Sequence, residues 1–126
     1  ELSKGDAAYT CDASTYSEKA SEILEDIYDS VERELEDADD DSFVYDINFE
    51  DGVLTIGLGK HGTYVINKQV PNRQLWWSSP LSGPKRFQFN EDKDIWENVR
   101  DPKGEPHLTD LLSQELKELI NLKVEF

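Results

Sequence analysis

The chain has few of the residues on which most disulfides and transition-metal sites depend. Its 126 residues include one cysteine, two histidines and no methionine. The single Cys11 excludes an internal disulfide and fits a reducing compartment, and its place near the start of the chain predicts a solvent-exposed thiol. One cysteine and two distant histidines do not match the ligand spacing of zinc sites. Because the chain starts at Glu1 and has no methionine, we expect a processed form whose targeting segment has been removed.

Long apolar runs and positive charges are also scarce. No apolar segment approaches the roughly 20 residues that a membrane-spanning helix needs. The 13 basic residues face 28 acidic ones, and the net charge of −15 repels nucleic-acid phosphates and anionic lipid surfaces. We therefore expect neither nucleic acid nor a membrane among the partners. With 37% apolar residues, the chain is long enough for one domain with one modest core.

Recognised catalytic and metal motifs are missing as well. There is no Gly-x-Ser-x-Gly elbow and no glycine-rich phosphate loop, so we assign no catalytic residue. The aspartates around residue 39 resemble the start of a calcium loop, but Ser42 and Asn48 stand where the loop needs glycine and glutamate. Neither histidine follows a glutamate by three residues, as carboxylate-bridged di-iron bundles require. His61 is expected to be an exposed turn residue, with metal ligation as the alternative.

Hydrophobic periodicity predicts a helix, a series of strands and a final helix. Apolar residues at a three-and-four spacing from Tyr16 to Leu35 predict a helix over about 15–38, and leucines from 108 onward predict a second one. Pro80 and Pro84 are expected in a connection and not inside a strand. Period-two patterns bounded by Gly, Pro, Asn or Asp predict strands over 43–49, 53–58, 63–69, 74–79, 86–90 and 95–98.

This order of elements predicts an α+β fold. We expect a two-layer α/β sandwich, in which the N- and C-terminal helices cover one face of an antiparallel sheet of about five to seven strands. The other face of the sheet should stay open to solvent. Residues 1–11 are predicted to be a disordered tail, and residues 12–126 a single domain. Leu122, Val124 and Phe126 alternate after the last helix and are predicted to fill the groove between the helices.

The first predicted helix carries most of the net charge. Between Asp12 and Asp41 there are 13 acidic residues and two basic ones. Neighbouring like charges at helical spacing each cost about 0.2–0.5 kcal/mol. The carboxylates on one face of this predicted helix are called the acidic ridge below. The ridge is either a solvated face, a docking surface for a basic partner, or a loose site for hard cations. Its members are Glu18, Glu22, Glu25, Asp26, Asp29, Glu32 and Glu36.

Amides, cations and tryptophans are concentrated in residues 62–87. If apolar residues such as Tyr64 and Trp77 face the core, the alternate side chains share the open face of the sheet. Tryptophan and arginine ringed by amides are typical of protein interfaces, whereas the alternative for Trp76 is packing under a loop. The predicted partner-binding surface, called the sheet patch below, consists of Asn67, Gln69, Asn72, Gln74, Trp76 and Arg86.

The same segment resembles the frataxin family. The residues Gly62–Gln69, Pro71-Asn72, Gln74, Trp76, Ser79-Pro80 and Ser82–Phe87 stand in the order and spacing of that family. The unbroken Gly-Thr-Tyr and Pro-Asn segments resemble its mitochondrial (eukaryotic) branch. Trp77 replaces a usual leucine, and Arg73 replaces a usual lysine.

The resemblance implies an iron-binding regulatory protein of iron-sulfur cluster assembly in the mitochondrial matrix, after removal of a transit peptide. The sheet patch and Arg73 would meet the scaffold protein, and the acidic ridge would dock on the cysteine desulfurase and bind Fe(II)/Fe(III) weakly, with no organic cofactor. The protein would promote persulfide transfer as an activator and not as a self-sufficient enzyme. The alternative is an iron chaperone or iron-storage protein with weak ferroxidase activity, which delivers iron for cluster and haem synthesis. A monomer is expected, with an iron-dependent oligomer as the alternative.

Overall fold

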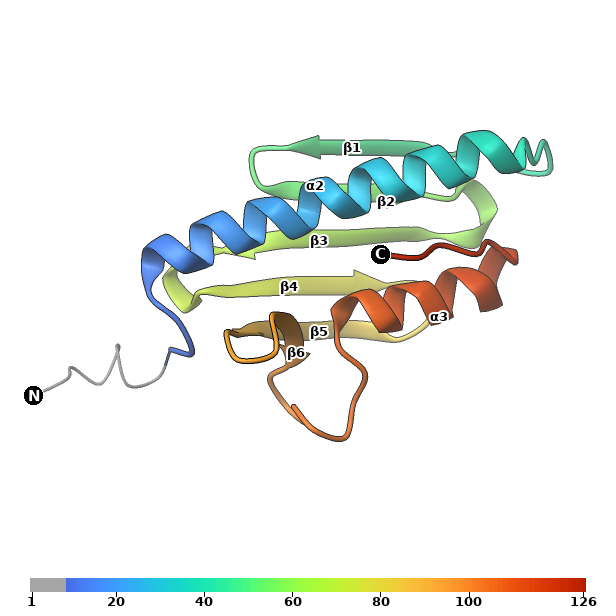
Figure 1. Ribbon diagram of the computed structural model, residues 1–126. Coiled ribbons are helices and arrows are strands. Elements are labelled where there is room, and N and C mark those ends of the chain that lie inside the picture. Colours follow the sequence, from blue (N-terminus) through green and yellow to red (C-terminus); the bar gives the residue numbers. More distant parts are fainter. Residues whose placement is uncertain (1–8) are drawn as a thin grey trace, which may run out of the picture.

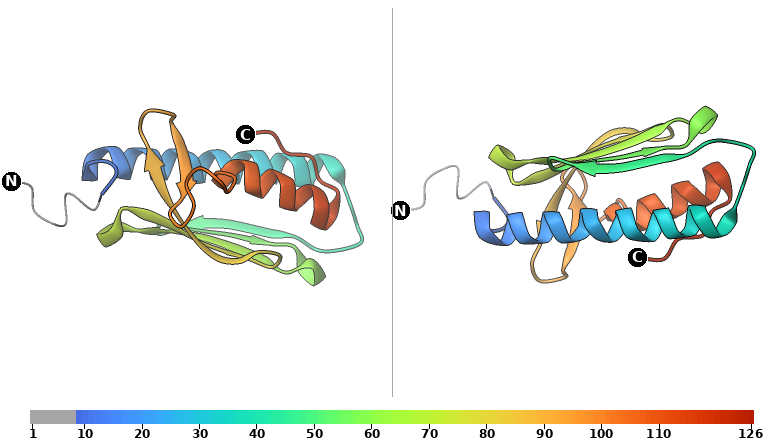
Figure 2. Two further views of the ribbon diagram at one scale, coloured as in Figure 1. Left: turned by 90° about the horizontal axis from the view of Figure 1, so that it is seen from below. Right: turned by 90° about the horizontal axis from the view of Figure 1, so that it is seen from above.

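Two helices and one antiparallel sheet make up the computed structural model, which describes residues 9–126. The six strands follow their chain order across the sheet. Helices α2 and α3 lie on the same face of this sheet (Figure 1, Figure 2), so the predicted two-layer α+β sandwich is confirmed. The elements are α2 (Ala13–Ala38), β1 (Asp46–Glu50), β2 (Val53–Gly57), β3 (Thr63–Gln69), β4 (Gln74–Ser79), β5 (Gly83–Asn90), β6 (Ile95–Asn98) and α3 (Leu108–Ile120), with 3-10 turns at Gly59–His61 and Val70–Asn72.

Helix α2 begins two residues earlier than predicted because Asp12 caps it. The Asp12 carboxylate accepts a hydrogen bond of 2.7 Å from the backbone N–H of Thr15, which satisfies one of the unpaired amides of the first turn. The helix ends at Ala38 and is capped by Asp39, which adopts a left-handed conformation with φ 46°. Its apolar stripe faces the sheet, and the buried members are Tyr16, Ala20, Leu24, Ile27, Val31 and Leu35. Neither helix within residues 9–126 has the length and apolar character needed to cross a bilayer.

A buried carboxylate ties α3 to the sheet. Glu115 is 5% exposed, and its Oε1 accepts hydrogen bonds from the Tyr64 hydroxyl, at 2.9 Å, and from Ser79 Oγ. Burying a carboxylate without such donors would cost on the order of several kcal/mol of folding free energy. These hydrogen bonds therefore fix the position of α3 over β3 and β4. Tyr64 in turn packs edge-to-face on Trp77, with ring centroids 5.5 Å apart.

Strand β5 is longer than predicted. It begins at Gly83 and contains Pro84, so the expectation that Pro84 lies in a connection is wrong. Pro84 pairs with Ser78 of β4, whereas β6 pairs with β5 only from Phe87 onward. The proline therefore lies where β5 is still an edge strand, and an edge tolerates a missing N–H. Strand β1 is shorter than predicted, because its partner β2 ends at Gly57, opposite Asp46.

The segment before α2 packs on the domain. Residues 1–8 lie outside the described residues, so the disordered tail stays a prediction there. Cys11, by contrast, is only 9% exposed, which corrects the predicted solvent-exposed thiol. Burial raises the pKa of the Cys11 thiol. The sequence pattern gave no sign of this packing, because it depends on contacts with residues 71 and 73, far along the chain.

The residues after α3 return over the helices (Figure 1). Leu122 and Val124 are buried, and Ser113 Oγ donates a hydrogen bond of 2.6 Å to the Val124 carbonyl. Phe126 is 43% exposed, so its predicted place in the groove is wrong.

We expect Leu122→Ala to lower the free energy of unfolding by about 2–4 kcal/mol, because it removes buried methyl groups and leaves a cavity. Urea unfolding followed by tryptophan fluorescence measures this change. Lys123→Ala is the matched control: its side chain is 77% exposed, and the change should stay within about 0.5 kcal/mol. Equal effects of the two substitutions would contradict this role of Leu122.

Stability should also fall between pH 10 and pH 12, in part because of Tyr16. Burial raises the pKa of Tyr16 from 10.0 to about 12 in the folded protein. Above pH 10 the unfolded chain releases this proton while the folded chain keeps it, so the contribution of Tyr16 is complete below pH 10 and is lost towards pH 12. Tyr16→Phe should flatten this part of the curve of unfolding free energy against pH. Burial also raises the pKa of Tyr64, so some slope should remain.

Candidate functional site

The open face of the sheet carries most of the sheet patch in two adjacent rows. The strand register places Asn67 beside Trp76, and Trp76 beside Arg86. In the neighbouring row, Gln69 lies beside Gln74. As predicted, Trp76 lies on the open face with 37% of its surface exposed, whereas the adjacent tryptophan of β4 is buried. The fold therefore brings five of the six predicted residues of the patch together.

Contacts within the patch hold the indole of Trp76 in one orientation. Its Nε1 donates a hydrogen bond of 3.1 Å to Gln74 Oε1. The guanidinium carbon of Arg86 lies 5.7 Å from the centroid of the Trp76 ring, within the range of a cation–π contact. Asn67 Nδ2 donates a hydrogen bond of 3.3 Å to the carbonyl of Lys68. An aromatic anchor that is already oriented loses less conformational entropy when a partner binds.

The remaining predicted residues, Asn72 and Arg73, lie in the turn between β3 and β4. Asn72 is exposed at one end of the patch. Arg73 is directed towards the N-terminal segment, not towards Trp76: its guanidinium carbon lies 3.9 Å from the centroid of the Tyr9 ring, and its Nη1 donates a hydrogen bond of 3.2 Å to the Cys11 carbonyl. The Tyr9 hydroxyl also donates a hydrogen bond of 2.8 Å to the carbonyl of residue 71. These contacts therefore fix the β3–β4 turn and the N-terminal segment relative to each other.

A groove of about 840 Å³ opens beside Trp76. One wall is the sheet, through Val65, Asn67, Trp76, Trp77, Ser78, Pro84, Lys85 and Arg86, and the other is the segment after β6, through Asn98, Val99, Arg100 and Glu105. The sequence analysis missed this second wall because residues 99–107 have no hydrophobic period that would place them. The groove extends the sheet patch beyond the strands.

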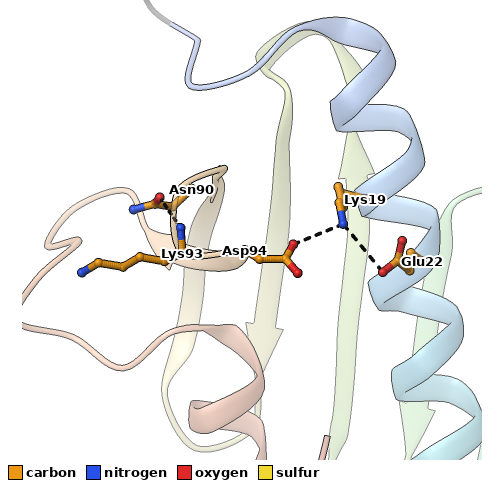
Figure 3. Close-up of polar contacts among 5 residues, drawn as sticks. All are labelled: Lys19, Glu22, Asn90, Lys93 and Asp94. Atoms are coloured by element: carbon orange, nitrogen blue, oxygen red, sulfur yellow. Dashed lines mark hydrogen bonds and ion pairs between the residues drawn. The ribbon is translucent and has the colours of Figure 1, made fainter.

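The acidic ridge lies along α2 as predicted, and six of its seven members are exposed. Glu32 is the half-buried member, and its hydrogen bond with Tyr28 raises the pKa of the Tyr28 hydroxyl. Lys19 is the basic residue within the ridge: its Nζ lies 3.9 Å from Glu22 Oε1 and 3.2 Å from Asp94 Oδ1 (Figure 3). The pKa of Lys19 is raised, mainly by the hydrogen bond to Asp94. This contact places the acidic β5–β6 turn next to the first half of the ridge, which the sequence pattern did not indicate.

The ridge side chains follow one helix face and do not converge on a point. Among residues 9–126, no group of three or more His, Cys, Asp or Glu side chains is arranged to hold a metal ion. His61 lies in the turn before β3 and packs edge-to-face on Phe43, with ring centroids 5.0 Å apart. Weak binding of iron along the ridge stays a prediction.

Comparisons with known proteins agree with this architecture. The family model of the Frataxin-like domain matches residues 9–122. The mitochondrial frataxin of Dictyostelium discoideum is 52% identical over 81 residues, which are 64% of this chain and 40% of that protein. The mitochondrial frataxin homolog of Saccharomyces cerevisiae is 41% identical over 106 residues, which are 84% of this chain and 57% of that protein. The chain thus spans about half the length of these relatives.

Solved structures show the same likeness. A crystal structure described as trimeric yeast frataxin complexed with ferrous iron has a TM-score of 0.69 at 37% sequence identity, and the match covers 82% of this chain and 86% of that one. The relatives named above are mitochondrial proteins, which confirms the expected mitochondrial location.

We expect Tyr9→Ala to release Arg73. The guanidinium carbon of Arg73 lies 3.9 Å from the centroid of the Tyr9 ring in the wild type. The NMR resonance of the Arg73 Nε–H should therefore be shifted upfield, and it should return towards the ordinary arginine position in the variant. Loss of an exposed cation–π contact also costs about 0.5–1 kcal/mol of unfolding free energy. Tyr9→Phe is the control, because it keeps the ring and loses only the hydrogen bond to residue 71. An Arg73 resonance that is identical in the wild type and Tyr9→Ala would rule the contact out.

Proposed function

The chain belongs to the frataxin family, and on that premise we propose that it is an iron-binding regulatory protein of mitochondrial iron-sulfur cluster assembly. It binds the complex of cysteine desulfurase and scaffold protein and promotes the transfer of persulfide sulfur to the scaffold. The observation that carries this proposal is the oriented Trp76–Arg86 pair, with Trp76 exposed, on the sheet face opposite the two helices (Figure 2).

The sheet patch is the surface proposed to meet the scaffold protein. Tryptophan and arginine are the residues most enriched among interface hot spots, and amides around them form hydrogen bonds without burying charge. Asn67, Gln69 and Gln74 surround Trp76 in this way. Asn72 extends the same surface at the turn. Arg73 takes part in the proposal only through the turn, because its guanidinium is held by Tyr9 and the Cys11 carbonyl.

The acidic ridge is proposed to dock on a basic surface of the desulfurase. Exposed carboxylates along 26 residues of helix produce a negative field that attracts a basic partner and orients it on approach. The contribution of such exposed charges falls as salt is added, because the Debye length is only about 8 Å at physiological ionic strength. Docking through the ridge should therefore depend on salt more strongly than docking through the sheet patch.

Two contact surfaces on one rigid domain allow the protein to act on its partners' equilibrium. A ligand shifts a conformational equilibrium only by the difference in its affinity for the two states. The proposed role is to bind the transfer-competent arrangement of desulfurase and scaffold more tightly than other arrangements. The chemistry then belongs to the partners, and this chain supplies binding free energy.

The second candidate function is that of an iron chaperone or iron-storage protein with weak ferroxidase activity. It is favoured by the ferrous iron named with the trimeric yeast frataxin, which is 37% identical to this chain. In this reading the ridge carboxylates bind Fe(II) as cargo, dioxygen oxidises it to Fe(III), and iron is delivered for cluster and haem synthesis. That yeast structure is trimeric, so this second candidate is proposed as an iron-dependent oligomer, in place of the monomer of the first candidate.

We expect Trp76→Ala to weaken binding to the purified desulfurase–scaffold complex by roughly 30-fold or more, because hot-spot tryptophans cost about 2 kcal/mol or more when truncated. Activation of sulfide production should fall at the same concentration of protein. Val44→Ala is the matched control: this side chain is 84% exposed and lies outside β1 and the sheet patch. Unchanged activation by Trp76→Ala would remove the sheet patch from the proposal.

Charge reversal on the ridge separates the two candidate functions. Glu18→Lys, Glu25→Lys and Asp29→Lys together should weaken both iron binding and activation, and they spare Glu22, which pairs with Lys19. Trp76→Ala should leave iron binding unchanged. Asp41→Lys, Glu118→Lys and Glu125→Lys together are the control, because they change the net charge equally at exposed sites off the ridge. If wild type does not activate sulfide production and the ridge variant still loses iron, the iron chaperone is the better reading.

A further inference from the structure

The groove beside Trp76 carries positive charge in a strongly acidic protein. The side chains of Arg86 and Arg100 line it, against the single carboxylate of Glu105. Lys85 pairs with the buried Trp77, so its side chain lies on the opposite face of the sheet. In the part of the chain that the structure describes, neither arginine forms an ion pair. With a net charge of −15, most of the surface repels acidic groups, so this groove is a place where they are attracted.

The outer wall of the groove is a built turn and not a loose loop. The Asn98 side-chain oxygen accepts a hydrogen bond of 2.9 Å from the backbone N–H of Arg100. Asp101 Oδ1 accepts one of 3.0 Å from Gly104 N–H, and the Asp101 carbonyl accepts one of 3.1 Å from Glu105 N–H. A Cβ atom at Gly104 would lie 2.3 Å from Asp101 Oδ2, so the turn closes tightly around that carboxylate. The backbone of Arg100 is therefore fixed at the wall of the groove that this residue lines.

Apolar residues also line the groove, beside the amides of Asn67 and Asn98 and the hydroxyl of Ser78, and they narrow the chemistry of the occupant. Val65, Trp76, Pro84 and Val99 lie in the same groove as the cations. A small inorganic anion would leave this apolar surface in water, and a purely apolar group would leave the cations unpaired. A segment that presents an apolar side chain and a carboxylate side by side satisfies both.

We propose that the groove binds an extended segment of the partner that presents an acidic side chain to Arg100 and an apolar side chain to Trp76. The inference rests on the proposed function, and it extends the partner-binding surface from the strands to the segment after β6. The protein then has two binding surfaces of opposite charge. The acidic ridge on α2 attracts basic groups of a partner, and the groove attracts acidic ones. Binding in the reversed orientation would set like charges against each other, so one orientation is selected.

The test compares two charge reversals on the same turn. Arg100→Glu and Lys103→Glu change the net charge equally, but only Arg100 lines the groove. Arg100→Glu should raise the Kd for the desulfurase–scaffold complex by about tenfold or more, because it replaces an attractive contact by a repulsive one. Lys103→Glu should change the Kd by less than about threefold. Circular dichroism and thermal unfolding of both variants check that the fold is intact.

Each outcome decides the inference. If the two reversals weaken binding equally, only the overall charge acts and the groove has no acidic occupant. If Trp76→Ala weakens binding and Arg100→Glu does not, the proposed function stands but the partner does not reach the turn, and the inference is wrong. If the wild type does not bind the complex at all, the proposed function fails. The proposed chemistry of the groove's occupant is then tested with two probe peptides.

The peptide probes alternate leucine with glutamate in one case and leucine with lysine in the other. They are titrated into the wild type while the NMR resonances of the Trp76 indole N–H and the Arg100 Nε–H are followed. The acidic peptide should shift both resonances, and the basic peptide should shift neither. Equal shifts with the two peptides, or no shift with either, would overturn the proposed chemistry of the groove.

Discussion

The core, the sheet patch and the groove beside Trp76 depend on one constraint, the two-residue alternation of strand β4 between a buried face and an open face. Trp77 can be buried against Tyr64 and Phe87 only if Trp76 points to the other side of the sheet. A shift of register by one residue would exchange the two indoles and bury the amides of the patch, so one-sided burial fixes the register strongly. The core and the partner-binding surface are thus specified together, by the same alternation.

Segments outside the strands form the borders of the open sheet face. Ser79 and Tyr64 hold Glu115 and thereby seat α3 over the strands, and the chain between β6 and α3 then passes beside the open face. At the other end of the patch, Tyr9 and Arg73 link the segment before α2 to the β3–β4 turn. The domain therefore offers two surfaces of opposite charge, with carboxylates along α2 and cations beside Trp76.

Much of the fold and part of the site could be predicted because both follow from local periodicity. The stripe from Tyr16 to Leu35 and the leucines from 108 onward placed the two helices. The alternation through β3, β4 and β5 placed the core face of the sheet and five residues of the sheet patch. The missed features depend on contacts between distant residues. The backbone at Cys11 is held by the turn some 60 positions later, and the Arg73 guanidinium packs on Tyr9. Pro84 is tolerated only because β6 does not extend along that part of β5.

The amino-acid sequence by itself determined which side chains share a face, since helical and strand periods act over a few residues and need no knowledge of the rest of the chain. It also determined the concentration of negative charge on α2 and, through the order of motifs in residues 62–87, the family. Only the tertiary structure decided what lies opposite those faces. Arg100 lines the groove and Asp94 pairs with Lys19. Both residues lie in turns without a hydrophobic period, and the positions of such turns are set by the elements that they connect.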